Sequence, residues 1–235
     1  MKKFLKKTSL FLVTAAMTVS APLMAWALEH DIVILHTNDI HCGINDNIGF
    51  AGLAQIKKDA LARTPNVALV DAGDAIQGAP IGKLSRGLAV VSIMNYLGYD
   101  FCIPGNHEFD YGMDRFMELA PLQRAGYYCA NFVYAGNNKQ VLPGYKIMQY
   151  EDTKVAFVGA STPESLTTST PTFFQNEKGQ YIYSFCEDKS GSKLYKQLQK
   201  NVDKARKEGA DYVFIVGHLA VSYTHLRAHE TLMNL

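Results

Sequence analysis

Excess charge of one sign, closely spaced cysteines and internal repeats are all missing from this sequence. Its 23 basic and 22 acidic residues leave a formal net charge of +1, so nothing in the overall charge attracts nucleic acid or an acidic membrane surface. A small charged ligand held by local groups fits this balance better. The cysteines, at positions 42, 102, 129 and 186, include no Cys-x-x-Cys pair. We therefore expect them to be buried or disulfide-bonded rather than metal ligands.

Four cysteines allow three full disulfide connectivities, and the sequence does not choose among them. Cys42 and Cys102 each lie close to a candidate ligand motif described below, so a metal role for these two stays open as the alternative.

The first 27 residues have the pattern of an exported precursor. A lysine-rich start precedes an apolar run over residues 10–24, which is followed by Ala25-Trp26-Ala27. This order of basic region, apolar region and small residues is typical of a secretory signal peptide. The apolar run contains Thr and Ser and is shorter than the roughly 20 residues that a membrane anchor needs. We expect cleavage after Ala27, export to the periplasm or cell surface of a bacterium, and no membrane span in the mature chain.

From Asp31 onward, β-rich runs alternate with amphipathic stretches. Apolar spacing predicts helices over residues 50–62, 88–97, 113–124 and 193–207. Short β-rich runs predict strands over residues 32–35, 67–70, 101–103, 127–132, 145–150, 155–158 and 212–216. This alternation favours an α/β fold with largely parallel strands. Residues 161–180, rich in Thr, Ser and Pro, are expected to form a long functional or mobile loop.

Potential metal ligands follow four of these predicted strands. They are Asp39 and His41, then Asp74, then Asn106, and finally His218. Each of the first two intervals is about one βαβ unit of roughly 30 residues, so parallel strands would bring the groups to one edge of the sheet. Asp39 and His41, two residues apart, would leave the strand pointing the same way. Oxygen and imidazole ligands suit Zn, Mn or a similar divalent ion.

Each of these motifs alone could be an ordinary turn or capping sequence. Their shared position at strand ends, in step with the βα period, favours a metal site instead.

Four short motifs carry a specific resemblance: HTNDIH at residues 36–41, GDAIQG at 73–78, GNHEFDYG at 105–112 and VGHL at 216–219. In this order they resemble the signature blocks of the calcineurin-like metallophosphoesterases. The first and third resemble the branch that contains 5'-nucleotidases, UDP-sugar hydrolases and 2',3'-cyclic-nucleotide phosphodiesterases. The resemblance covers residues 32–219. It implies an α/β fold in which a metallophosphoesterase-type double β-sheet sandwich is flanked by helices and is incomplete at the C-terminus.

The resemblance also implies a centre of two divalent metal ions, Zn, Mn or similar. Asp39 and His41 would bind the first ion, Asp74 would bridge both ions, and Asn106 with His218 would bind the second.

Two further residues receive catalytic roles from the resemblance. His107 would stabilise the transition state and protonate the leaving group, and Asp110 would orient it. The implied reaction is hydrolysis of nucleotide or nucleotide-sugar phosphate esters by attack of metal-held hydroxide on phosphorus. Related dimetal hydrolases of cyclic nucleotides or sulfur substrates, and a metal-binding module without turnover, remain alternatives.

The pattern breaks after Leu219. A Gly-His-x-His block, which in the family supplies one further ligand to each metal, is missing from the sequence, and the string from Val221 to Thr231 resembles a translated transposase sequencing adapter. We expect a truncated domain over residues 28–220, an artefactual tail over residues 221–235, and weak or no activity of this chain. The alternative is that His225 and His229, four residues apart, bind a metal from one face of a helix.

Overall fold

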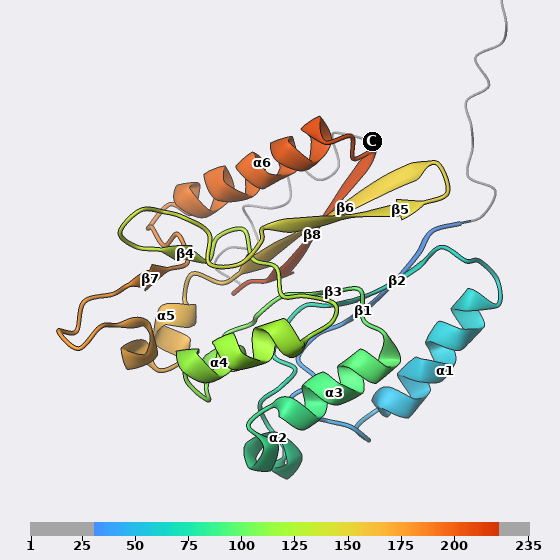
Figure 1. Cartoon of the computed structure of the whole chain (residues 1–235), viewed down its shortest axis with the longest axis horizontal. Coiled ribbons are helices and arrows are strands. Elements are labelled where there is room, and N and C mark those ends of the chain that lie inside the picture. The colour runs from blue at the N-terminus through green and yellow to red at the C-terminus, as the bar shows by residue number, and fades with distance from the viewer. Residues whose placement is uncertain (1–30, 221–235) are drawn as a thin grey trace, which may run out of the picture.

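The computed structural model describes residues 31–220 as two stacked β-sheets with helices on both outer faces (Figure 1). The first sheet contains β1 (Val33–Thr37), β2 (Val67–Asp71) and β3 (Phe101–Cys102), in that order and all parallel. The predicted signal peptide and the predicted tail over residues 221–235 lie outside the described residues.

The second sheet contains β5 (Tyr145–Tyr150), β6 (Thr153–Ser161) and β8 (Tyr212–His218). β5 and β6 form an antiparallel hairpin, and β8 pairs in parallel with β6. A separate two-stranded sheet joins β4 (Val133–Tyr134) to β7 (Tyr183–Ser184) in antiparallel orientation.

The helices cover the outer face of each sheet. Figure 1 shows the first sheet covered by α1 (Gly49–Leu61), α3 (Leu88–Leu97) and α4 (Met113–Leu119), with the short α2 (Pro80–Ser85) beside α3. The second sheet is covered by α6 (Ser192–Lys207). One more helical turn, α5, spans Ser165–Thr168. None of the helices within residues 31–220 has the length and hydropathy to cross a membrane.

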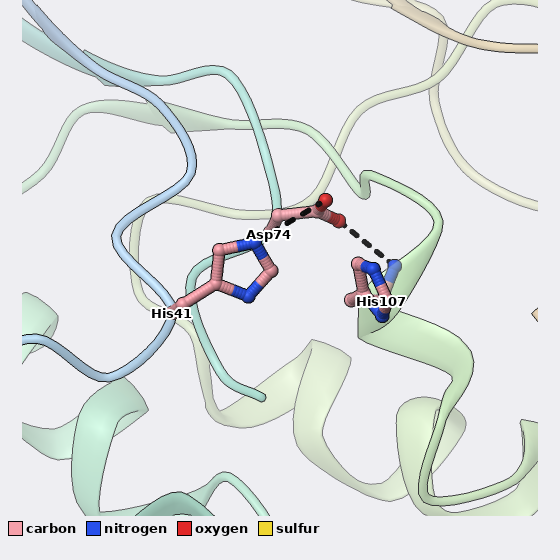
Figure 2. A group of neighbouring side chains, drawn as sticks. All are labelled: His41, Asp74 and His107. Atoms are coloured by element: carbon pink, nitrogen blue, oxygen red, sulfur yellow. Dashed lines mark hydrogen bonds and ion pairs between the residues drawn. The ribbon is translucent and has the colours of Figure 1, made fainter. Parts of the chain in front are cut away.

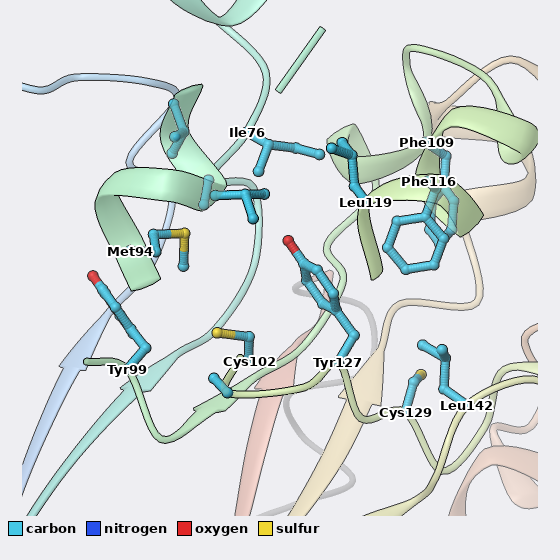
Figure 3. Packing of buried hydrophobic residues seen from close by; sticks show 14 of the residues in the cluster. Ile76, Met94, Tyr99, Cys102, Phe109, Phe116, Leu119, Tyr127, Cys129 and Leu142 are labelled. Carbon is cyan, nitrogen blue, oxygen red and sulfur yellow. The ribbon is translucent and has the colours of Figure 1, made fainter. Parts of the chain in front are cut away.

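Three apolar layers explain why the sheets and helices stack, and the smallest joins Ala156 of β6 to Ala205 of α6. β2 is buried along its whole length, because Val70 packs toward the second sheet while Leu69 packs toward the helices. Phe101 and Phe157 come from opposite sheets and meet in the layer between them. The largest layer lies under α3 and α4 and includes Met94 (Figure 3). A strand that is apolar on both faces is typical of the centre of a parallel sheet.

Most of the predicted elements are present, and the predicted α/β fold of two packed sheets flanked by helices is confirmed. The helix predicted over residues 113–124 is too long, because α4 ends at Leu119 and a 3-10 turn with Pro121 follows; proline cannot continue an α-helix. The loop predicted over residues 161–180 contains α5 and a second 3-10 turn. The short α2 was not predicted.

The strand predicted over residues 127–132 is wrong. The N–H groups of Tyr128, Cys129 and Ala130 donate to the carbonyl oxygens of Cys102, Pro143 and Gly159 in turn. Because consecutive residues bond to three different segments, no regular ladder forms and the chain crosses between the sheets here. The β-rich composition of the segment instead reflects its burial.

The cysteines are thiols without disulfide bonds. Cys42, Cys102 and Cys129 are buried, and Cys186 is half-buried. Burial raises the pKa of Cys42 to about 11, and neither group of potential metal ligands found within residues 31–220 includes a cysteine. The expectation of buried cysteine is confirmed for three of the four residues.

Candidate metal centre

The loops that follow β1 and β2 run side by side beyond the ends of their strands. The N–H groups of Asp39 and His41 donate to the carbonyl oxygens of Gly73 and Asp74, at 3.0 and 2.9 Å. β1 itself ends at Thr37, so Asp39 and His41 do not continue the strand. Strand alternation therefore does not orient them, because both residues have left-handed backbone conformations, with φ of 51° and 47°. Their side chains nevertheless lie together, with Nε2 of His41 3.9 Å from Oδ1 of Asp39.

Asp74 also has a left-handed backbone, with φ of 59°. Such conformations are uncommon for residues other than glycine and cluster at functional sites. Asp39, His41 and Asp74 therefore lie in strained backbone within the paired loops after β1 and β2, which we call the double loop. That strain is an independent reason to look for function here.

The carboxylate of Asp74 lies at the centre of the site and is only 2% exposed. Its Oδ2 atom is 3.2 Å from Nε2 of His218 and 3.8 Å from Nε2 of His41. Its Oδ1 atom accepts the backbone N–H of His107 at 2.8 Å. Figure 2 shows His41 and His107 on either side of Asp74, each on a different loop.

These distances define two overlapping groups of potential ligand atoms. Asp74, Asp39 and His218 form one group, and Asp74, His41 and His107 form the other; within each group the atoms lie within 4.8 Å of one another. Asp74 belongs to both groups, which is the arrangement expected of a residue shared by two ions.

Backbone carbonyl groups orient both His41, in the loop after β1, and His218, at the end of β8. Nδ1 of His41 is 3.2 Å from the carbonyl oxygen of Gln77, and Nδ1 of His218 is 3.0 Å from that of Ala72. A carbonyl oxygen only accepts hydrogen bonds, so each Nδ1 carries the proton. In the neutral imidazole this leaves the lone pair on Nε2, and each Nε2 faces Asp74. Histidine ligands of metals are commonly oriented in this way.

The charge balance of the centre couples Asp74 to His218. Burial disfavours the charged form of His218, but the hydrogen bond to Asp74 and its negative charge outweigh burial and raise the pKa of His218 to about 9. Burial likewise raises the pKa of Asp74, yet the contacts with His218 and His107 outweigh it and lower that pKa below its usual value. Without an ion, an imidazolium therefore supplies the positive charge that the carboxylate requires.

The third loop carries Asn106, His107 and Asp110. Asn106 precedes the 3-10 turn η1 (His107–Phe109), and Nδ1 of His107 is 2.7 Å from Oδ2 of Asp110. The ring of His107 meets that of His41 edge to face, with centroids 5.1 Å apart. Burial opposes protonation of His107, but the hydrogen bond to Asp110 and the charge of Asp74 outweigh it and raise the pKa of His107.

The structure thus brings the predicted residues of all four strand ends to one edge of the sandwich. It groups His107 with Asp74 and His41, whereas the sequence resemblance gives the ligand role on that loop to Asn106. A cavity of about 400 Å³ adjoins the centre, bordered by His36, Asn38, Asp39 and His218 among others.

Two buried carboxylates beside the centre were not predicted. Asp71 accepts hydrogen bonds from the hydroxyl of Thr37 at 2.7 Å and from the N–H of Gly73 at 3.1 Å. Glu108 is 1% exposed and accepts N–H groups from the loops after β2 and β3. The one sequence feature that hints at their burial is their position. Asp71 ends an apolar strand, and Glu108 comes directly before the apolar Phe109. Burial is the main reason that the pKa of each is raised.

Comparison with known proteins adds a family assignment to this geometry. The model of the calcineurin-like phosphoesterase family matches residues 32–233. The 5'-nucleotidase of Rattus norvegicus is 30% identical over 240 residues, which cover 92% of this chain and 38% of that protein. The chain spans little more than a third of the length of such curated relatives.

Solved structures give the same fold. Sulfate thiohydrolase SoxB from Thermus thermophilus superposes with a TM-score of 0.61 and 29% identity, covering 73% of this chain and 30% of that one. A 5'-nucleotidase precursor, also from Thermus thermophilus, has a TM-score of 0.67 and 24% identity, covering 80% of this chain and 37% of that one.

Proposed function

The chain belongs to the calcineurin-like phosphoesterase family, and on that premise we propose that it is the catalytic part of an exported hydrolase of nucleotide phosphate esters. The observation that carries this proposal is the position of Asp74, whose buried carboxylate is shared by two groups of ligand atoms. A single carboxylate between two such groups is what a pair of divalent ions requires.

The donor set fits two divalent ions. Following the family resemblance, we assign Asp39 and His41, whose Oδ1 and Nε2 atoms lie 3.9 Å apart, to one ion, Asp74 to both, and Asn106 with His218 to the other. This assignment differs from the two groups of ligand atoms, which pair Asp39 with His218 and His41 with His107. Carboxylate, amide and imidazole groups suit zinc or manganese, and the fixed Nδ1 protons of both histidines leave Nε2 available. When bound, two such ions would polarise the phosphoryl oxygens and acidify the attacking water. Each ion would have three protein ligands, so we propose weak binding and slow turnover by this chain.

His107 and Asp110 are the proposed proton donor and its orienting partner. Asp110 accepts the Nδ1 proton of His107, which turns Nε2 toward a substrate rather than toward the protein. The raised pKa of His107 favours the protonated form that must give a proton to the departing alkoxide. The side chain of His107 is 34% exposed, so a ligand can reach it.

The names of relatives support nucleotides or nucleotide sugars as substrates, because the rat protein that shares 30% identity is a 5'-nucleotidase. The lysine-rich start and following apolar run support export to the periplasm or cell surface. A second candidate follows from the likeness to sulfate thiohydrolase SoxB, at 29% identity. Metal ligands alone do not fix the leaving group, so a thiosulfate ester is the competing substrate class.

One experiment separates these functions. The purified chain, loaded with Mn²⁺ or Zn²⁺, is assayed for phosphate release from AMP, for formation of UMP and glucose 1-phosphate from UDP-glucose, for formation of adenosine monophosphate from 2',3'-cyclic AMP, and for sulfate release from S-sulfocysteine. The Asp74→Asn variant serves as the blank, and Asp188→Asn is the matched control, because it makes the same change at a half-buried carboxylate that caps the start of α6. We expect slow phosphate release from AMP that EDTA and Asp74→Asn abolish and Asp188→Asn preserves.

Sulfate release in place of phosphate release would favour the second candidate. Metal binding with no turnover of any substrate would leave a metal-binding module. Phosphate release that survives both EDTA and Asp74→Asn would refute the metal centre itself.

A further inference from the structure

The loops after β2 and β3 touch backbone to backbone beneath the metal centre. A Cβ atom added to Gly73 would collide with the backbone of Gly105, and one added to Gly105 would collide with the carboxylate of Asp74. Both glycines are therefore required by close approach. The position of Asp74 relative to His107 consequently depends on whatever holds these two loops together.

The carboxylate of Glu108 lies between the loops and bonds to both. Its Oε2 atom accepts the N–H groups of Asp74 at 2.7 Å and Gly105 at 2.6 Å. Its Oε1 atom accepts the N–H of Ala75 at 2.8 Å. In the opposite direction, the N–H of His107 donates to Asp74 at 2.8 Å. Each loop thus supplies a carboxylate that accepts backbone N–H groups of the other loop.

We propose that Glu108 is a positioning residue of the metal centre, whose carboxylate fixes the loop of Asp74 against the loop of Asn106 and His107 before any ion binds. This inference rests on the proposed function, since it assigns Glu108 a role toward the same ions. Glu108 itself is buried behind Asp74 and is not a ligand in this assignment.

The chemistry of the contact requires a carboxylate rather than a polar group of equal size. Glu108 is almost fully buried, and a buried charge is tolerated only where hydrogen bonds replace its water. Here the backbone N–H groups supply them, with donors at each oxygen. A glutamine has one acceptor oxygen, so its NH₂ group would face backbone N–H donors in either orientation: those of Asp74 and Gly105 at the Oε2 position, or those of Ala75 and Ile76 at the Oε1 position. Glu108→Gln therefore keeps the volume and sets two donors against each other beside the loop of Asp74.

The test is Mn²⁺ binding to the full 235-residue chain, measured from the electron paramagnetic resonance signal of free Mn²⁺. We expect Glu108→Gln to weaken binding about 10- to 100-fold, the usual effect of losing an outer-shell partner of a ligand. Leu194→Ala is the control, because Leu194 is a buried residue of α6, the helix that covers the second sheet, and its loss destabilises the fold without touching the loops. Its affinity for Mn²⁺ should match that of the wild type.

A spectroscopic readout separates positioning from general stability. With Co²⁺ in place of Mn²⁺, Glu108→Gln should alter the visible d–d spectrum, whereas Leu194→Ala should not. Wild-type Mn²⁺ affinity and an unchanged Co²⁺ spectrum in folded Glu108→Gln would overturn the inference. A wild-type chain that binds no Mn²⁺ would instead overturn the proposed function.

If the Glu108→Gln chain does not fold, two further measurements still test the inference. Glu108→Asp keeps the charge but shortens the side chain by one methylene, and we expect it to weaken Mn²⁺ binding as well. Wild-type affinity in this variant would count against the positioning role of Glu108. In the wild type, the amide protons of Asp74, Ala75 and Gly105 should be protected from hydrogen exchange. Exchange at unprotected rates would also overturn the inference.

Discussion

Replacing Phe109 with alanine should remove a large part of the stability of this domain. Phe109 is 0% exposed, and its ring meets four other rings, with centroids 4.9 Å away at Phe116, 5.2 Å at Phe174, and 5.5 Å at both Phe132 and Phe185. A phenylalanine buries about 200 Å², which at about 25 cal/mol per Å² corresponds to about 5 kcal/mol.

That figure is an upper value, because the denatured chain already buries part of the ring. Large-to-small core substitutions of phenylalanine cost about 3–5 kcal/mol, and we expect Phe109→Ala to fall in this range. Since domains are stable by about 5–15 kcal/mol, the variant would be left marginal. The assay is equilibrium urea unfolding, followed by circular dichroism, with the free energy of unfolding extrapolated to water.

Two companion variants calibrate the result. Tyr96→Ala removes an aromatic ring that is 92% exposed, and it should change the free energy of unfolding by no more than about 0.5 kcal/mol. Phe109→Leu should lie between the two. If Phe109→Ala lost no more stability than Tyr96→Ala, the aromatic cluster would not anchor η1, and the account of how His107 and Asp110 are held would fail.

Three other predictions concern the site and the start of α6. Asp110→Asn should reduce turnover about 100-fold or more, because His107 loses its orienting carboxylate, while Mn²⁺ affinity falls far less, because His107 is not a metal ligand in the proposed assignment; a matched fall in both would point to misfolding. Gly73→Ala should destabilise the chain by about 1–3 kcal/mol in urea unfolding, because its φ of 93° and its closeness to Gly105 both disfavour a Cβ. Desolvation raises the pKa of Asp188, but hydrogen bonds from the first residues of α6 outweigh it and lower that pKa. This group therefore stabilises the fold above its unfolded pKa of about 3.9 and loses that effect as the pH falls through its lower folded pKa. Asp188→Ala should accordingly lower the thermal midpoint at pH 7 and leave it unchanged at pH 2, and an equal loss at both values would contradict the assignment.

The strand ends that carry the site could be predicted because two sequence signals mark each of them: an apolar run and the polar residues that follow it. The apolar run over residues 67–70 reads as a buried strand, and polar residues follow at once, so both the strand and the position of Asp74 are visible. Parallel pairing then places Asp39 and Asp74 at one edge, and the structure has them there. The same reasoning applied to residues 127–132 failed, because apolar and aromatic composition reports burial and not the partner of each N–H group.

The backbone conformation of the double loop could not be predicted from sequence. A positive φ at Asp39, His41 and Asp74 arises from the bonds that each loop makes with the other, and no local pattern encodes such a pairing. The roles of Asp71 and Glu108 are hidden for a related reason. An acidic residue near a turn usually faces solvent, and only the packed structure shows that Glu108 accepts several backbone N–H groups and that Asp71 accepts the hydroxyl of Thr37 and the N–H of Gly73.

The buried carboxylates also explain why this edge of the sandwich is suited to cations. The charge of Glu108 adds to burial in raising the pKa of Asp71, and the charge of Asp74 does the same for Glu108. Three carboxylates therefore oppose one another, and among the described residues the histidines at the centre supply the nearby positive charge only while protonated. A pair of divalent ions would relieve this repulsion while both histidines stay neutral, with each Nε2 atom bound to an ion instead of to a proton. The closeness of these carboxylates, and not the backbone hydrogen bonds to Glu108, which lower its pKa, thus favours divalent ions at the centre over the protons that would otherwise neutralise it.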